Sequence, residues 1–156
     1  MHTALRAILF YNARMLMLTL PELRKLLEDN FPGAARAVVL THLEPNYLEL
    51  RLPFRDDMLR PGGTLSGPAL MTLADTGAYY LILAHIGPVL LAVTTSLNIN
   101  FMRKPIAEEV IATVHMLKLG RALAVVEVRM RNVSSDALVA QATVTYSIPP
   151  ESRSAE

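Results

Sequence analysis

Near its N-terminus the chain carries leucines at helical spacing, namely Leu23, Leu26 and Leu27. Thr19 and Glu22 have the residue types and the separation of a capping box, in which each side chain binds the backbone N–H of the other residue. We therefore predict a short N-terminal helix that begins after Thr19 and ends ahead of the Phe-Pro-Gly sequence that follows.

Later segments alternate between apolar and polar residues, a period that is typical of strands with one buried face. The alternating segments are residues 38–40, 48–54, 91–101, 110–116, 126–130 and 138–148. Pro45-Asn46 predicts a turn between the first two. Leu119-Gly120 and the Ser-Ser-Asp sequence at 134–136 predict antiparallel hairpins among the last three.

Residues 67–84 (GPALMTLADTGAYYLILA) are apolar on every side and include a single charge, Asp75. A helix without a polar face is a buried helix. Pro68 suits its first turn, and Gly87-Pro88 ends it. Runs of strands beside one buried helix indicate an α+β fold. We predict an antiparallel sheet of about six strands wrapped around this long central helix.

The 156 residues and their 52 % hydrophobic content suit one domain with a sizeable core. We place this domain at residues 19–149, after an N-terminal extension (1–18) and before a loose tail (150–156). The extension is either helical or partly the product of an upstream start codon, with Met15 or Met17 as the true beginning. It lacks the uninterrupted apolar region of a signal peptide, and no apolar run reaches the ~18 residues of a membrane span. We expect a cytoplasmic protein without a membrane partner.

Charge and residue types exclude several classes of protein. Fifteen Lys and Arg against fourteen Asp and Glu give a net charge of +1, whereas a nucleic-acid partner would favour a basic excess. The absence of cysteine excludes disulfides, thiolate metal sites and cysteine nucleophiles. The four histidines lack metal-ligand spacing, and no GxSxG sequence is present. His85 falls at the predicted C-terminal end of the central helix, where the helix dipole favours positive charge.

Asp75 is the residue on which a functional hypothesis depends. A carboxylate within an apolar helix is costly unless it is solvated, paired or protonated. One interpretation is structural, with Asp75 in a solvent gap or hydrogen-bonded across a subunit contact. The other is chemical, with Asp75 as a nucleophile or a general base. The helix holds no Lys or Arg, so the partner of Asp75 must come from elsewhere in the fold.

The glycine-rich segment ahead of the helix, RPGGTLSGPA from Arg60 to Ala69, is the second candidate. Backbone N–H groups at a helix N-terminus can bind an oxyanion or a phosphate. Glycine-rich helix entrances are also common without a ligand, and this one matches neither a P-loop nor a dinucleotide fingerprint.

The order of these elements and several short sequences resemble a known family. RPGGTLSGP, followed by LADTGA around Asp75, is similar to the motif of hotdog-fold thioesterases of the phenylacetate-pathway type, in the 4-hydroxybenzoyl-CoA thioesterase superfamily. SLNINFMRKP resembles the family's strand that ends in an aromatic residue, a basic residue and proline. LKLGRALAVVEVRM and ALVAQATVTY resemble its last two strands. The resemblance extends from Arg60 to Ile148 and implies the hotdog fold.

By this resemblance Asp75 is the catalytic carboxylate, which attacks a thioester or activates water. The Gly67 N–H polarises the thioester carbonyl at the start of the central helix, where developing negative charge is stabilised. The Thr94 hydroxyl lies where relatives carry a hydroxyl that helps to place the water.

The chain departs from the family pattern at three catalytic-loop positions. It has Ser66, Pro68 and Arg60 where the family has His, Gly and Asn. Ser66 keeps a hydroxyl at the catalytic position, and Pro68 removes one N–H but is tolerated in a first helical turn. Arg60 supplies a donor to the substrate or steers an anionic one.

The family's substrate contains coenzyme A (CoA), whose phosphates Lys and Arg side chains can meet. The substrate-binding residues implied near the CoA are Phe101, Arg103, Lys104, Lys118, Gly120 and Arg121. The family builds its sites between subunits. The resemblance therefore implies a homodimer, with a homotetramer kept open, in which Asp75 faces the glycine loop of a second copy.

The leading hypothesis is an acyl-CoA thioesterase that uses no cofactor and no metal. The alternative is a non-catalytic hotdog protein that binds acyl-CoA as a sensor or carrier. A hotdog hydratase ranks last, because it needs a histidine paired with the carboxylate. Met71, Ala78 and Ile82 on the central helix indicate an apolar pocket for an acyl or aryl group.

Overall fold

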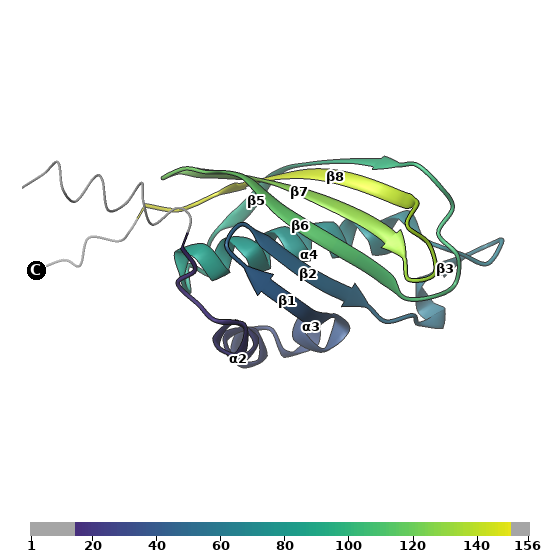
Figure 1. The fold of residues 1–156 in the computed structure, drawn as a ribbon, viewed down its shortest axis with the longest axis horizontal. Helices are drawn as coiled ribbons and strands as arrows, with labels where there is room; N and C mark the ends of the chain where they lie inside the picture. The colour runs from purple at the N-terminus through teal and green to yellow at the C-terminus, as the bar shows by residue number, and fades with distance from the viewer. Residues whose placement is uncertain (1–14, 151–156) are drawn as a thin grey trace, which may run out of the picture.

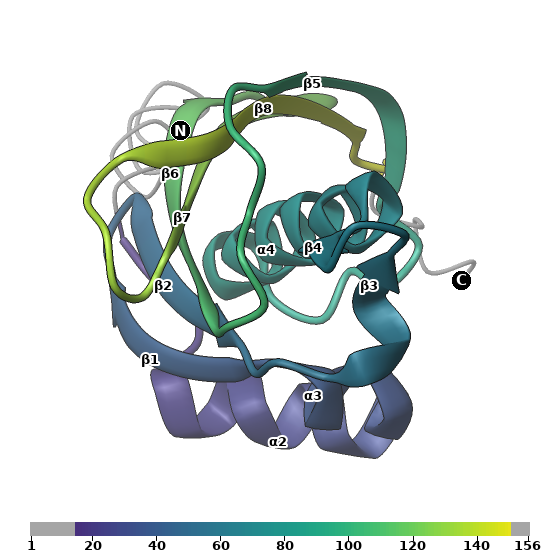
Figure 2. The ribbon, with the colours of Figure 1, turned by 90° about the vertical axis from the view of Figure 1, so that its right-hand side faces the viewer.

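A six-stranded antiparallel sheet curves around one long helix, as predicted (Figure 1, Figure 2). The computed structural model describes residues 15–150, and the expectations for residues 1–14 and 151–156 lie outside it. The strand order is β1-β2-β6-β7-β8-β5. The strands are β1 (Val39–Glu44), β2 (Tyr47–Leu52), β5 (Val93–Phe101), β6 (Val110–Leu119), β7 (Leu123–Asn132) and β8 (Leu138–Ser147).

The central helix α4 (Gly67–Ile86) begins at its N-cap Ser66 and ends at Gly87, whose φ of 81° suits a residue that leaves a helix. The sheet packs closely on it, since a Cβ at Gly77 would lie 2.9 Å from a methyl group of Val114. The length and composition of α4 would also suit a membrane span, but most of it is buried inside this fold. Its predicted start and end agree with the structure within a helical turn.

Helix α2 (Leu20–Asn30) lies against β1, at one edge of the sheet (Figure 2). Thr19 Oγ1 accepts from the Glu22 N–H at 3.4 Å and Glu22 Oε2 accepts from the Thr19 N–H at 2.8 Å, which confirms the predicted capping box. The Arg24 guanidinium donates to the Leu40 carbonyl oxygen in β1. Helix α2 therefore covers part of the edge at β1, whereas no further strand of the described chain pairs with β5 at the other edge.

A second short helix, α3 (Pro32–Ala37), was not predicted. The Phe31-Pro32-Gly33 sequence indicated a helix end, and α2 does end at Asn30. Pro32 then begins a new helix. Proline is tolerated there because the N–H of a first-turn residue forms no hydrogen bond within the helix, so its absence costs nothing.

The loop predicted ahead of α4 contains a short 3-10 turn, η1 (Asp56–Met58), and a small hairpin of β3 (Leu59–Arg60) with β4 (Thr64–Leu65). Gly62 and Gly63 turn the hairpin at φ values of 100° and 73°, in the left-handed region that glycine adopts without strain. The hairpin leads directly into the N-cap of α4.

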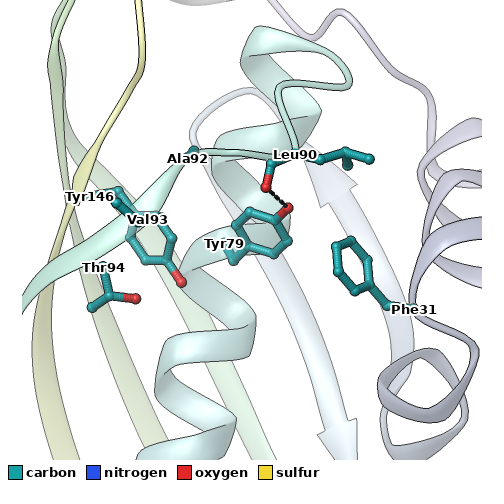
Figure 3. A pocket seen from close by; sticks show the side chains of 7 residues that line it. All are labelled: Phe31, Tyr79, Leu90, Ala92, Val93, Thr94 and Tyr146. Atoms are coloured by element: carbon teal, nitrogen blue, oxygen red, sulfur yellow. Dashed lines mark hydrogen bonds between the residues drawn. The ribbon is translucent and has the colours of Figure 1, made fainter.

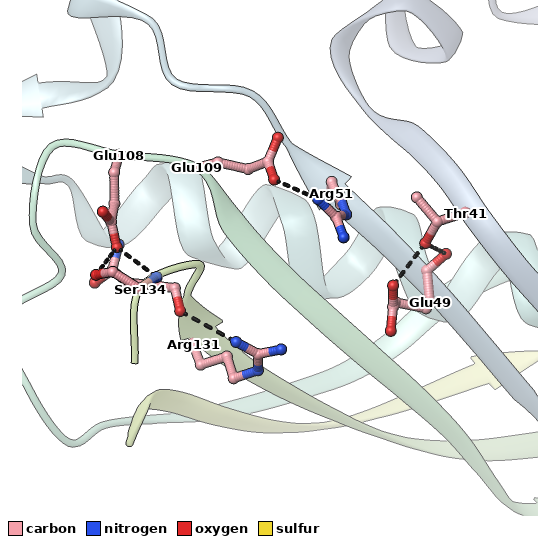
Figure 4. Close-up of polar contacts among 8 residues, drawn as sticks. Thr41, Glu49, Arg51, Glu108, Glu109, Arg131 and Ser134 are labelled. Atoms are coloured by element: carbon pink, nitrogen blue, oxygen red, sulfur yellow. Dashed lines mark hydrogen bonds and ion pairs between the residues drawn. The ribbon is translucent and has the colours of Figure 1, made fainter. Parts of the chain in front are cut away.

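A buried asparagine fixes the loop that follows β5. The Asn132 side chain accepts from the Ile106 N–H at 3.1 Å and donates to the Ile106 carbonyl oxygen at 3.2 Å. Glu108 in this loop accepts two hydrogen bonds from the turn between β7 and β8 (Figure 4). The Pro105 carbonyl oxygen accepts from the Leu65 N–H of β4 at 3.1 Å. The clamped loop therefore supports the entrance to α4.

His85 is buried near the C-terminal end of α4 and links two other segments. Its Nε2 accepts from the Asn46 N–H at 3.0 Å, and its Nδ1 lies 3.2 Å from the Met15 carbonyl oxygen. Burial lowers the pKa of His85 below its ordinary value of 6.5 and outweighs the contact with Met15, which raises it. At this helix end, desolvation of the buried imidazole therefore opposes the positive charge that the helix dipole favours.

Candidate active site

Two hydroxyl groups converge on the carboxylate of Asp75, which is half-buried on α4. Thr94 Oγ1, near the start of β5, donates to Asp75 Oδ1 at 2.6 Å. The Tyr146 hydroxyl, near the end of β8, donates to the same oxygen at 2.8 Å and lies 3.2 Å from the Asp75 carbonyl oxygen. The partners of Asp75 are thus neutral hydroxyls, and no ion pair found within residues 15–150 includes it. We call Asp75, Thr94 and Tyr146 the carboxylate end.

Tyr146 was not among the site residues expected from the sequence. It continues the buried alternation of β8, after Ala142 and Val144, and only 3 % of it is exposed. Burial raises the pKa of the Tyr146 phenol above its ordinary value of 10, so the hydroxyl keeps its proton and acts as a donor. The sequence did contain one signal for Tyr146. This residue carries a hydroxyl at a strand position that faces the central helix, and the one charge of that helix needs hydrogen-bond donors.

A shallow, wide-open cavity of about 380 Å³ lies beside the carboxylate end. The side chains that line it are Phe31, Tyr79, Leu90, Ala92, Val93, Thr94 and Tyr146. The Tyr79 ring stacks on Tyr146 with centroids 5.7 Å apart, and its hydroxyl donates to the Leu90 carbonyl oxygen at 2.9 Å. Figure 3 shows Thr94 and Tyr146 on the sheet side of Tyr79, and Phe31 on the α2 side.

This cavity is not where the sequence indicated an apolar pocket. Ala78 and Ile82 are fully buried in the core, where the sheet packs on α4. Met71 is exposed and does not share a surface with them. Helical spacing alone does not distinguish a face that lines a cavity from a face that fills the core.

The entrance to α4 presents one free backbone donor. The first N–H groups of a helix have no intrahelical partner. Here Pro68 has no N–H, the Ala69 N–H donates to Ser66 Oγ at 3.3 Å, and the Leu70 N–H reaches the Ser66 carbonyl oxygen at 3.4 Å. The Gly67 N–H has no partner among residues 15–150. Ser66, expected at a catalytic position, is thus the N-cap of α4.

The ring of Phe101, at the end of β5, lies over Gly67. A Cβ at Gly67 would lie 3.2 Å from Phe101 Cζ, so glycine allows the close approach. Phe101 is 53 % exposed and borders the free N–H without enclosing it. We call Ser66, Gly67 and Phe101 the glycine end.

The two ends do not meet within one chain. Gly67 and Asp75 lie on the same helix, eight residues and therefore about 12 Å apart along its axis. One carbonyl group cannot contact both. The structure brings Thr94 to Asp75 and Phe101 to Gly67, and it separates these two pairs.

The cationic residues expected near CoA are divided in the same way. Arg103 and Lys104 follow the end of β5, and Arg103 donates to the Leu138 carbonyl oxygen at 3.0 Å. Lys118, Gly120 and Arg121 lie at the β6–β7 turn, at the same end of the sheet as the start of β5 but separated from it by β8. A nine-residue strand such as β5 spans about 30 Å, so the two groups lie at opposite ends of the sheet. Arg60 is exposed on the β3–β4 hairpin, near the glycine end.

The fold and these two ends define a class of protein. The sequence pattern of the thioesterase superfamily matches residues 62–139, half of the chain, and includes both Gly67 and Asp75. The chain belongs to this superfamily, and its sheet and central helix are the hotdog fold. Membership supports the hydrolysis of thioesters as its general activity.

Individual relatives agree with this assignment. A candidate thioesterase of Silicibacter sp. TM1040 is 39 % identical, with 88 % of this chain and 96 % of that chain covered and a TM-score of 0.82. Thioesterase superfamily member 2 of Mus musculus is 26 % identical, with 85 % and 100 % covered and a TM-score of 0.73. A candidate esterase of Thermoplasma acidophilum is 25 % identical over 89 residues, which are 57 % of this chain and 67 % of that protein.

Proposed function

We propose that this protein hydrolyses acyl-CoA thioesters, with Asp75 as the general base. The observation that carries the proposal is the half-buried carboxylate with two hydroxyl donors, both of which also line an open cavity. Water attacks the thioester carbonyl carbon as its proton passes to Asp75. The C–S bond then breaks, the CoA thiolate takes up a proton, and the free acid leaves. A direct attack by the Asp75 carboxylate, through an anhydride that water opens, would give the same products.

The negative charge that develops on the carbonyl oxygen needs a fixed donor. The Gly67 N–H at the N-terminus of α4, which has no partner among the described residues, is such a donor, and the helix dipole adds to its effect. Because Gly67 lies about 12 Å from Asp75 in the same chain, the donor must come from a second copy. The proposed site is therefore shared between two subunits.

The geometry of β5 supports such a pairing. β5 is an edge strand whose outer hydrogen-bonding groups no other described strand uses, and such an edge can pair with another chain. If two copies pair along β5 in antiparallel orientation, the start of one strand lies beside the end of the other. The carboxylate end of one subunit then lies near the glycine end of its partner. We propose this homodimer, which a further pairing could extend to a tetramer.

The same arrangement gives the substrate a place at each end. The cavity takes the acyl group, because several apolar side chains line it and because Thr94 and Tyr146, which bind the Asp75 carboxylate, also line it. Antiparallel pairing brings Arg103 and Lys104 of one copy toward the β6–β7 turn of the other, which carries Lys118 and its neighbours. These cations can then contact the phosphates of one CoA molecule.

Release of thiol from a panel of short, long, branched and aryl acyl-CoAs tests the proposal. The protein has no cysteine, so it adds no background to a thiol-reactive dye. We expect turnover on at least one substrate and a loss of about 10³-fold in kcat for Asp75→Asn. Asp29→Asn, an exposed aspartate on α2, is the matched control and should behave as wild type. Binding of acyl-CoA without any turnover would instead favour the alternative of a non-catalytic protein that binds acyl-CoA as a sensor or carrier.

A further inference from the structure

The two oxygens of the Asp75 carboxylate have different surroundings. Both hydroxyl donors, from Thr94 and Tyr146, bind Oδ1. Among residues 15–150, no donor lies within hydrogen-bond distance of Oδ2. A carboxylate oxygen without a protein donor is the one that can accept a hydrogen bond, and then a proton, from water.

The donors also differ in how firmly they are held. Thr94 is exposed and lies next to a register shift in the edge strand β5. Tyr146 lies in β8, paired on both sides by β5 and β7, and is buried. Its ring stacks on Tyr79, whose own hydroxyl is bound to the Leu90 carbonyl oxygen. Packing and pairing therefore leave the Tyr146 hydroxyl little freedom to move away from Asp75.

We propose that Tyr146 is a positioning residue, whose hydroxyl fixes Oδ1 of Asp75 and so directs Oδ2 toward the reacting water. This inference rests on the proposed hydrolysis, since it assigns an orientation to the same carboxylate. The raised pKa of the Tyr146 phenol agrees with a permanent donor. Tyr146 itself does not exchange a proton with the substrate.

Tyr146→Phe removes this hydroxyl and keeps the stacked ring. With the best acyl-CoA of the panel, we expect kcat to fall about tenfold with KM unchanged, because orientation matters in the transition state more than in substrate binding. Tyr80→Phe is the matched control. Tyr80 is the next tyrosine on α4 after Tyr79, and its buried hydroxyl has no hydrogen-bond partner in the described structure. Its loss should leave kcat and KM unchanged.

A second comparison tests whether Tyr146 acts through Asp75. If it does, adding Tyr146→Phe to Asp75→Asn should not lower the residual kcat further. An additional tenfold loss in that background, or a raised KM with unchanged kcat, would overturn the positioning role. The thermal unfolding of Tyr146→Phe and its binding of acyl-CoA, measured by calorimetry, are the controls for its fold. Both should be close to those of the wild type.

The two proposals fail in different ways. Full turnover by Asp75→Asn, or no turnover by the wild type on any acyl-CoA, would overturn the proposed function and this inference with it. An inactive Asp75→Asn together with a Tyr146→Phe variant of wild-type kcat would overturn only the role of Tyr146.

Discussion

The carboxylate end and the glycine end occupy the same helix but differ in how far one chain completes them. At the carboxylate end, Asp75 receives both of its donors from β5 and β8 of its own chain. At the glycine end, the Gly67 N–H has no partner within the described chain, and the Phe101 ring beside it is half exposed.

The difference shows which polar groups need hydrogen-bond partners from their own chain. A carboxylate in an apolar helix is costly unless it is hydrogen-bonded, so the sheet supplies hydroxyls to it. A backbone N–H at a helix terminus can remain open to water at little cost, and it stays available to a ligand. Under the proposed function, the glycine end serves a carbonyl group that is held at the carboxylate end of a second subunit.

Among the tests that compare the two ends, removal of the Gly67 N–H is expected to change activity most. Gly67→Pro deletes this donor at a first-turn position that proline tolerates. Gly67→Ala introduces a similar Cβ contact with Phe101 and keeps the N–H. We expect kcat for Gly67→Pro to be about 10²-fold below that of Gly67→Ala, as for the loss of one oxyanion donor. Equal kcat values for the two variants would show that the Gly67 N–H does not stabilise the transition state.

Mixing two impaired variants then tests whether the ends belong to different subunits. Hybrid dimers of Asp75→Asn and Gly67→Pro, formed by unfolding and refolding the mixture, contain one intact site. Random pairing should restore about a quarter of the wild-type activity. No recovery in verified hybrid dimers would mean that both groups act from the same chain.

The loop beneath the glycine end offers the next test. Asn132→Ala leaves the Ile106 N–H without its partner, whereas the Ile106 carbonyl oxygen keeps the hydrogen bond from the Glu108 N–H at 2.8 Å. Asn132 is buried, so the lost hydrogen bond is not readily replaced by water. We expect a loss of about 2 kcal/mol in the free energy of unfolding, measured with urea. Asn30→Ala, at an exposed asparagine on α2, is the control and should change stability by less than about 0.5 kcal/mol. A stability loss as small as that of the control would show that the loop does not depend on the clamp.

The smallest expected effect concerns His85, which supports the scaffold common to both ends. Its pKa is lowered in the folded state, so the unfolded chain binds a proton at a pH where the folded chain does not. The stability from the neutral imidazole is therefore present above pH 6.5 and is lost as the pH falls below it. We expect the free energy of unfolding of the wild type to fall as the pH is lowered through this range, by less than the loss in Asn132→Ala.

Urea unfolding between pH 5 and pH 8 measures this dependence. His85→Gln should flatten the dependence relative to wild type. If the free energy of unfolding of His85→Gln depends on pH as steeply as that of the wild type, other groups cause the pH dependence.

Much of the fold could be predicted from local patterns. The capping box at Thr19 and Glu22 and the helix end at Gly87 depend on residues close together in the chain, and both are found in the structure. The helix α3 was missed because Pro32 can follow one helix and begin another, and local sequence alone does not decide between these outcomes. For the candidate site, Asp75 stood out as the one charge in its helix.

The periodicity of the chain determined by itself that an antiparallel sheet covers an apolar helix, and that this helix carries a carboxylate. Only the tertiary structure decided which groups meet that carboxylate, because Tyr146 lies 71 residues away along the chain. It also decided that Gly67 and Asp75 lie about 12 Å apart along one helix, and that burial lowers the pKa of His85. Hydrogen bonding and desolvation depend on which distant segments come into contact, and the order of residues within one element does not contain that information.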